Sequence, residues 1–195
     1  MIIDLRGQRK LLALAMLVAA ILLGFILHRW IWRSLYPLPY RDTIFRFAGE
    51  NDLPPLLVAA VIRVESRFRP DATSPAGARG LMQVMPETGQ WVAGQLGLPN
   101  FEPDMLYHPE TNIRIGTWYL GQLRREFDQN LILALAAYNG GRGNVREWLS
   151  RNPSRSPSSG YRPKDIPFPE TRDYVQRVLR DYVRYLRLYP DVERR

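Results

Sequence analysis

The sequence predicts a mostly helical domain that follows one strongly apolar helix near the N-terminus. Two observations carry this prediction. Residues 11–27 contain no charged side chain, whereas the apolar residues after position 40 recur at helical spacing between polar ones. Because no alternating strand pattern exceeds a few residues, we expect any sheet to be small and to lie within residues 70–85 or 151–169.

The apolar segment has the length and the flanks of a membrane-spanning helix. At about 1.5 Å per residue, residues 11–27 form a helix roughly 25 Å long. Trp30 and Trp32 extend it to the thickness of a hydrocarbon core and suit an interfacial position. Three basic residues precede it and slightly outweigh those that follow: Arg6, Arg9 and Lys10. We therefore predict an uncleaved single-pass anchor with the N-terminus inside and the body outside.

Two alternatives to an anchor are open. A cleaved signal peptide shares the basic start and the apolar middle, but residues 28–33 read His-Arg-Trp-Ile-Trp-Arg and offer no small-residue cleavage site. A buried core helix normally carries a polar face, which residues 11–27 lack. With the anchor, the predicted segments are a short cytoplasmic N-terminus (1–10), the transmembrane helix (11–32), a spacer (33–40), the main helical domain (41–189) and a tail (190–195).

Seven helices are predicted in the domain. The segment 56–66 is apolar on nearly every face, so we expect it to be central and buried. The sequence Asn139-Gly140-Gly141 is a stop signal, and residues 151–169 are rich in Pro, Ser and Gly and read as a long loop. The predicted helices are 41–48, 56–66, 86–96, 111–127, 131–138, 145–149 and 171–189.

The last of these helices has a basic stripe. Arginines recur at helical spacing along one side, and we expect this side to be a solvated face partly neutralised by Asp173 and Asp181. Contact with phosphates or anionic lipid is the alternative. The stripe consists of Arg177, Arg180, Arg184 and Arg187.

Composition excludes several kinds of chemistry. The chain has no cysteine and only two histidines, His28 and His108, so it predicts no thiol chemistry, no metal site and no cofactor. Its net charge of +8 is typical of proteins with an anionic partner. Nucleic acid is the least favoured partner, because no groove-reading motif is present. Any bond cleavage must depend on carboxylates, hydroxyls or amides.

Glu65 is the first candidate for that chemistry. It stands at the end of the apolar helix 56–66, where burial disfavours the charged form and raises the pKa of a carboxyl group. A carboxyl that keeps its proton near neutral pH can serve as a general acid. The alternative is a helix-end glutamate that forms an ion pair with a nearby arginine.

Several short motifs surround Glu65 in a fixed order. They are Glu65-Ser66-Arg67-Phe68, Ser74-Pro75-Ala76-Gly77-Ala78, Gly80-Leu81-Met82-Gln83, Asn112-Ile-Arg-Ile-Gly116, Ala137-Tyr138-Asn139-Gly140-Gly141 and Pro169-Glu170-Thr171-Arg172-Asp173-Tyr174-Val175. Together, over about residues 42–188, they resemble the soluble-type lytic transglycosylases, a family related to goose-type lysozyme. The resemblance implies a mostly α, lysozyme-like α+β fold, in which a helical bundle forms a cleft beside a small antiparallel sheet.

The resemblance also implies a site. Glu65 matches the family's single catalytic acid and base, and Ser74 a serine that hydrogen-bonds near that glutamate or the sugar. The other matches are substrate-binding groups: Met82, Gln83, Tyr138, Asn139 and Glu170. Four of these have simpler interpretations. Methionine usually packs in the core, Tyr138 and Asn139 could be no more than the end of a helix, and Glu170 could do no more than complement a helix dipole.

The implied reaction cleaves the β-1,4 bond between N-acetylmuramic acid and N-acetylglucosamine in peptidoglycan and leaves a 1,6-anhydro end. One glutamate suffices for it if the substrate's N-acetyl group assists. The alternatives are a hydrolytic muramidase on the same fold and a non-catalytic peptidoglycan-binding component of an envelope complex. The implied location is the bacterial cytoplasmic membrane, with the domain facing the periplasm and protein partners in an envelope complex as a further expectation.

Overall fold

The computed structural model describes residues 5–151 and 156–192 and divides into two compact units. The first unit is Met1–Pro37 and the second is Leu38–Arg195. Three short stretches lie outside the described residues: 1–4 of the predicted N-terminal segment, 152–155 of the predicted long loop and 193–195 of the predicted tail.

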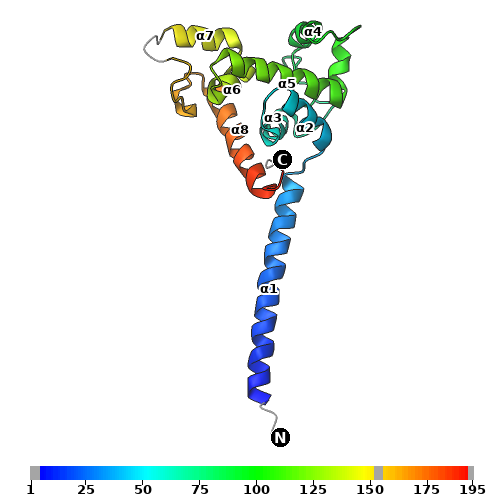
Figure 1. Ribbon diagram of the computed structural model, residues 1–195, viewed down its shortest axis with the longest axis vertical. Helices are drawn as coiled ribbons and strands as arrows, with labels where there is room; N and C mark the ends of the chain where they lie inside the picture. The colour runs from blue at the N-terminus through cyan, green and yellow to red at the C-terminus, as the bar shows by residue number, and fades with distance from the viewer. Residues whose placement is uncertain (1–4, 152–155, 193–195) are drawn as a thin grey trace. The chain divides into compact units, whose positions relative to one another are not determined.

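The first unit is one long helix, α1 (Leu5–Leu35) (Figure 1). Its segment Leu14–Leu35 has a mean hydropathy of 2.1 and is long and apolar enough to cross a membrane. Large apolar side chains on it are exposed; Phe25, for example, is 66% exposed. The helix also continues through residues 33–35, which we had assigned to the spacer.

Within the described residues, every regular element of the second unit is an α-helix or a 3-10 turn. Every predicted helix is present within a few residues of its expected ends, while two short 3-10 turns were not predicted because they are too short to show a period. The elements are α2 (Arg41–Glu50), α3 (Pro55–Ser66), α4 (Pro86–Gln95), η1 (Pro103–Tyr107), α5 (Pro109–Glu126), α6 (Leu131–Gly140), α7 (Arg142–Ser150), η2 (Pro163–Asp165) and α8 (Pro169–Leu188).

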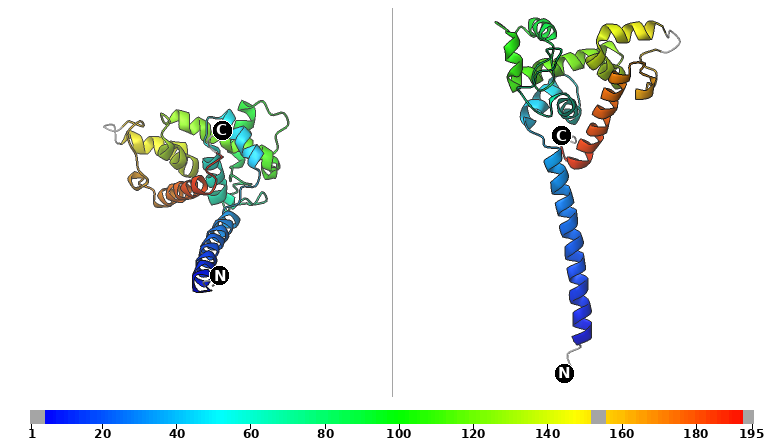
Figure 2. Two further views of the ribbon diagram at one scale, coloured as in Figure 1. Left: turned by 60° about the horizontal axis from the view of Figure 1, so that its bottom comes forward. Right: turned by 180° about the vertical axis from the view of Figure 1, so that it is seen from behind.

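Helix α3 forms the core, as its composition predicts. All residues from Leu56 to Ile62 are fully buried, and the helix packs between α2 and α8. Helix α5 packs against α2, α4 and α6, and α6 in turn packs against α7 and α8. Helices α4, α5, α6 and α7 therefore gather at one end of the unit, an arrangement that Figure 2 shows from two further directions.

The predicted small antiparallel sheet is not confirmed. Within the described residues there are only two isolated antiparallel bridges, Thr73 to Arg79 and Arg79 to Val84, both inside the predicted range 70–85. The carbonyl of Arg79 accepts from the backbone N–H of Val84 in the second bridge and also from the side chain of Asn112. Gly80 turns the chain there with φ +74°, and a Cβ at this position would lie 2.1 Å from the carbonyl oxygen of Leu106.

The described part of the long loop, residues 156–169, is held by hydrogen bonds and an aromatic contact. The amide of Asn130, which also caps α6, donates to the carbonyls of Pro157 (2.8 Å) and Ser159 (3.0 Å). Tyr161 is buried and makes an edge contact with Trp148. The described residues of this loop form no strand.

Helix α8 is amphipathic, with one departure from the prediction. Asp181 lies on its buried face and pairs with Arg63 of α3 at 3.4 Å, as well as with Arg180 at 3.7 Å. It therefore joins two helices, whereas we expected it to neutralise an exposed stripe. Arg177, Arg180 and Arg187 are exposed as predicted, and Arg184 is half-buried.

Candidate active site

Glu65 lies in the last turn of α3, where the helix is forced to end. Arg67 and Phe68 follow it in the left-handed conformation, with φ of 54° and 62°. The hydroxyl of Ser66 donates to the carbonyls of Ile62 (3.2 Å) and Leu81 (2.8 Å), so it joins the end of α3 to the chain at residue 81. The carboxyl of Glu65 is thus held by a buried helix and remains only partly accessible.

Burial raises the pKa of Glu65 from 4.5 to about 7, although an interaction with the Tyr174 hydroxyl and the charge of Arg177 both act to lower it. The loss of hydration is therefore the dominant effect. Near neutral pH the protonated and ionised forms are both populated. A group in this condition can give a proton and take one back in the same catalytic cycle.

Tyr138 reaches this region from the end of α6. Its hydroxyl donates to the carbonyl oxygen of Met82 at 2.8 Å. Burial, then the nearby Glu65, then Tyr119 raise the pKa of Tyr138 well above its usual value. Tyr138 therefore stays neutral, and its oxygen keeps the capacity to accept a hydrogen bond.

Tyr174 of α8 approaches Glu65 from another direction and was missed by the sequence analysis. Its hydroxyl is buried and has no hydrogen-bond partner of ordinary geometry among the described residues. The hydroxyl nevertheless acts to lower the pKa of Glu65, and burial followed by the charge of Glu65 raises the pKa of Tyr174 well above its usual value. The signal was available, because Tyr174 lies in a quoted motif and on the apolar face of its helix.

A second group that the sequence analysis missed is Asn112, which organises the loop beside Glu65. Its Oδ1 accepts from the backbone N–H of Met82 at 2.7 Å. Its amide donates to the carbonyls of Arg79 (2.9 Å) and Leu106 (2.7 Å). Asn112 is fully buried, so all these groups depend on one side chain. The carbonyl of Met82 is held in place for Tyr138 as a result.

Three of the predicted binding residues build this loop. Met82 is fully buried, and its sulfur lies so close to Gly116 that a Cβ there would be 2.6 Å away. Its predicted contact with sugar is therefore not supported for the side chain, whereas its backbone joins Asn112 to Tyr138. Gln83 donates from Nε2 to the carbonyls of Ala72 (3.1 Å) and Gly80 (2.8 Å).

Ser74 also acts within the loop. Its hydroxyl accepts from the backbone N–H of Ala78 at 3.0 Å, and its own backbone N–H donates to the carbonyl of Ala78 at 2.9 Å. These bonds close a tight turn. The hydrogen bonds found in the described chain do not join Ser74 to Glu65.

The remaining two predicted binding residues are exposed. Asn139 directly follows Tyr138 in α6, and Glu170 lies in the first turn of α8. A Cβ on Gly140 would lie 2.7 Å from Oγ1 of Thr171, so the end of α6 and the start of α8 are in close contact. The structure thereby brings the chain segments of Asn139 and Glu170 together at the surface.

Comparisons with known proteins agree with this architecture. Residues 42–159 match the family described as "Transglycosylase SLT domain". The chain is 41% identical over 145 residues to the soluble lytic murein transglycosylase of Escherichia coli K12, covering 74% of this chain and 22% of that protein. It is 31% identical over 169 residues to the membrane-bound lytic murein transglycosylase C of Actinobacillus pleuropneumoniae, covering 76% of this chain and 46% of that one.

A solved structure matches the fold. The crystal structure of the 70 kDa soluble lytic transglycosylase SLT70 from Escherichia coli aligns with a TM-score of 0.72 and 38% identity, covering 80% of this chain and 25% of that one. The chain therefore spans about a quarter of the length of this relative.

Proposed function

Because the chain belongs to the transglycosylase SLT domain family, we propose that it is a lytic transglycosylase of peptidoglycan. It cleaves the β-1,4 bond between N-acetylmuramic acid and N-acetylglucosamine and leaves a 1,6-anhydromuramic end. The observation that carries the proposal is the single carboxyl of Glu65, whose pKa is raised to about 7. Two neutral tyrosines, Tyr138 and Tyr174, interact electrostatically with this carboxyl.

One carboxyl group performs both proton transfers in this reaction. Protonated Glu65 first gives its proton to the glycosidic oxygen as the bond from that oxygen to C1 of the muramic residue breaks. The carboxylate then takes the proton from the C6 hydroxyl of the same residue as this oxygen bonds to C1. Glu65 is protonated again at the end, and no water is consumed. The N-acetyl group of the substrate assists the departure, which explains how one carboxyl suffices.

The surrounding residues have distinct roles in the proposal. Tyr138 and Tyr174 orient the Glu65 carboxyl and the substrate's polar groups without carrying charge. Asn139 and Glu170, which are exposed, bind the glycan strand directly. Ser74 and Gln83 shape the loop, and their remaining hydrogen-bonding groups bind the substrate. Met82 contributes through its backbone carbonyl, which holds the Tyr138 hydroxyl.

Product analysis tests the proposal directly. Purified sacculi are digested with the full chain, and the released muropeptides are analysed by mass spectrometry. We expect 1,6-anhydro ends from the wild-type chain and no release by a Glu65→Gln preparation. Reducing muramic ends would instead establish a hydrolytic muramidase, in which an activated water replaces the C6 hydroxyl. Binding of sacculi without any release would establish the non-catalytic alternative.

We further propose that α1 anchors the enzyme in the bacterial cytoplasmic membrane, with the domain on the periplasmic side. Support comes from the apolar segment Leu14–Leu35 and from the membrane-bound relative. Protease added outside spheroplasts should degrade the domain while the protein fractionates with membranes. Release of the domain into the soluble periplasm, with a new N-terminus after α1, would contradict the anchor and favour a cleaved signal peptide.

A further inference from the structure

An aromatic row leads from Tyr138 to the surface, and the proposed reaction uses none of its members beyond Tyr138. The ring of Tyr138 lies 5.7 Å from that of Tyr119, which lies 6.2 Å from Trp91. Trp91 then meets Trp118 edge-on at 5.5 Å. These distances are typical of interacting aromatic pairs. The row crosses three helices, because Tyr138 belongs to α6, Tyr119 and Trp118 to α5, and Trp91 to α4.

The outer end of the row is not a core cluster. Trp91 is 41% exposed, and Trp118, Tyr119 and Tyr138 are each partly accessible. An aromatic cluster that only held α4 on α5 would gain more from full burial. Exposed aromatic side chains that lie in contact with one another mark binding surfaces more often than isolated ones do.

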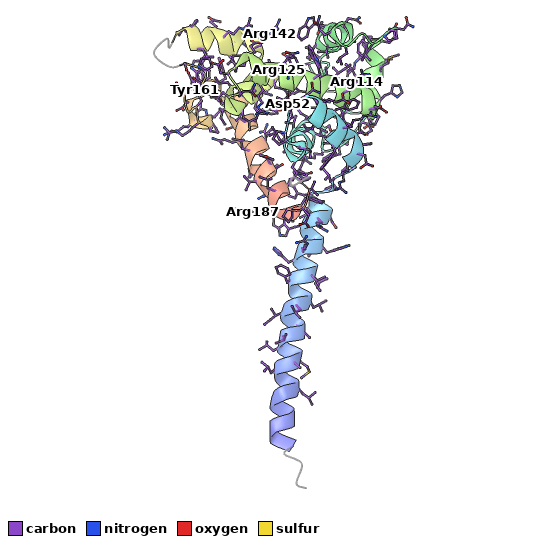
Figure 3. The ribbon with its side chains drawn as sticks, in the orientation of Figure 1. Asp52, Arg114, Arg125, Arg142, Tyr161 and Arg187 are labelled. Carbon is purple, nitrogen blue, oxygen red and sulfur yellow. The ribbon has the colours of Figure 1, made fainter. Side chains whose placement is uncertain are left out.

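A cationic side chain packs on the exposed end of the aromatic row. Arg142, the first residue of α7, lies with its guanidinium 5.3 Å from the centre of the Trp91 ring. Its side chain is drawn near the end of α7 that faces α4 (Figure 3). Stacking on an indole restricts the guanidinium and the ring to one arrangement. Tryptophan and arginine together are the side chains most enriched among residues that dominate binding energy.

From this arrangement we propose that Trp91, Trp118 and Arg142 form an outer subsite for the glycan strand, distant from the bond that is cleaved. This inference rests on the proposed function, which makes an amino-sugar polymer the substrate. The row begins at the loop that adjoins Glu65, since the Tyr138 hydroxyl donates to the carbonyl of Met82 and the carbonyl of Leu81 accepts from Ser66, which directly follows Glu65. A strand held at Glu65 and continuing along the row reaches Trp91, where the C–H face of a pyranose ring packs on exposed indole. Arg142 holds the indole in place and donates to oxygens of the strand.

An outer subsite has a specific consequence, because only long strands can reach it. It stabilises strands that extend past the central site and contributes nothing to short ones. The measurement is therefore the ratio of two affinities in a Glu65→Gln background, which prevents cleavage. The probes are peptide-free glycan strands of about four and of more than ten sugars, and the full chain is used in detergent micelles. We expect Trp91→Ala to lower the long-to-short affinity ratio about tenfold.

Matched variants separate binding from folding. Trp91→Phe keeps an aromatic face and should restore most of the ratio. Trp148→Ala is the control, since Trp148 is a partly accessible tryptophan that pairs with a tyrosine, Tyr161, but lies outside the row. Arg142→Ala should lower the ratio about threefold, whereas Arg151→Ala, which removes another exposed arginine near the end of α7, should not change it. Thermal melts verify that each variant is folded.

Two outcomes overturn the proposal. If Trp91→Ala leaves the ratio unchanged, or if Trp148→Ala lowers it equally, the row is a packing feature only. Failure of the proposed function looks different, because the binding ratio does not depend on cleavage. An enzyme that releases no 1,6-anhydro ends but shows the expected ratio would retain the outer subsite and lose the transglycosylase assignment.

Discussion

The candidate site has a buried half and an exposed half, and the two are built differently. Glu65, Asn112 and Tyr174 come from α3, α5 and α8, and each has its polar group in the interior. Asn139 and Glu170, by contrast, lie in water at the ends of α6 and α8. In the buried half, burial changes the acid–base behaviour of a side chain, because it raises the pKa of Glu65. The exposed half can only add contacts to the substrate.

The largest expected difference between the halves is in catalysis. Glu65→Gln removes the only proposed acid and base and should lower the rate of sacculus digestion by about a thousandfold or more. The same substitution at Glu170 removes one exposed binding carboxylate and should cost about tenfold at most, chiefly in KM. Turnover of purified sacculi measures both. Equal losses would show that the two carboxyls act as a pair, and the single-carboxyl mechanism would have to be abandoned.

Stability should show the next largest difference. Asn112→Ala leaves the N–H of Met82 and the carbonyl of Leu106 without their partner, whereas the carbonyl of Arg79 keeps its bond from the N–H of Val84. We expect the free energy of unfolding to fall by about 4 kcal/mol, since each buried unpaired group costs about 1–3 kcal/mol. Asn144→Ala removes a single exposed bond to the carbonyl of Gly140 and should cost less than about 0.5 kcal/mol. Denaturant titration compares the two variants, and similar losses would remove the special role of Asn112.

The raised pKa of Glu65 also predicts a pH dependence of stability. In the unfolded chain the carboxyl ionises near 4.5, and in the folded chain near 7. Between these values folding takes up a proton, so the free energy of unfolding falls as the pH rises from about 4.5 to about 7, by at most about 3 kcal/mol. Glu65→Gln lacks this titration. Relative to the wild type, the free energy of unfolding of the variant should therefore rise by up to that amount between about pH 4 and pH 8.

Denaturant midpoints of the two proteins across this pH range measure the effect. Glu170→Gln is the matched control and should follow the wild type, because Glu170 is exposed. A constant difference between the wild type and Glu65→Gln at every pH would show that Glu65 is ordinarily hydrated.

The smallest expected effect concerns Tyr174. Its hydroxyl lowers the pKa of Glu65, so Tyr174→Phe should move the pH profile of kcat to higher pH and lower kcat about tenfold. Tyr107→Phe, which removes a hydroxyl bonded to Thr73 at 2.8 Å, is the control and should leave the profile in place. If the pH profile of kcat does not move in Tyr174→Phe, the Tyr174 hydroxyl does not act on Glu65.

The sequence was most informative where a residue's role follows from its own helix. The apolar run of α3 predicted both a central helix and the raised pKa of the glutamate at its end, and both are present. Helical period also predicted α8. It could not reveal that Asp181 turns inward to Arg63, because that pairing depends on how α8 packs on α3.

The loop beside Glu65 was less predictable for the same reason. Ser74 and Gln83 bond within the loop itself. Met82 is buried, and its N–H donates to Asn112, which stands 30 residues further along the chain. No local pattern specifies such a contact. The aromatic row is similar, because Trp91, Tyr119 and Tyr138 meet only when α4, α5 and α6 are packed.

The central claim is that Glu65 holds its proton near neutral pH, and a direct titration of its carboxyl tests this most closely. Carbon-13 spectra of glutamate-labelled protein, compared between the wild type and Glu65→Gln, identify its resonance. The account predicts a midpoint near 7 for this carboxyl. A midpoint at the ordinary value near 4.5 would contradict it, because an ionised Glu65 could not give the first proton.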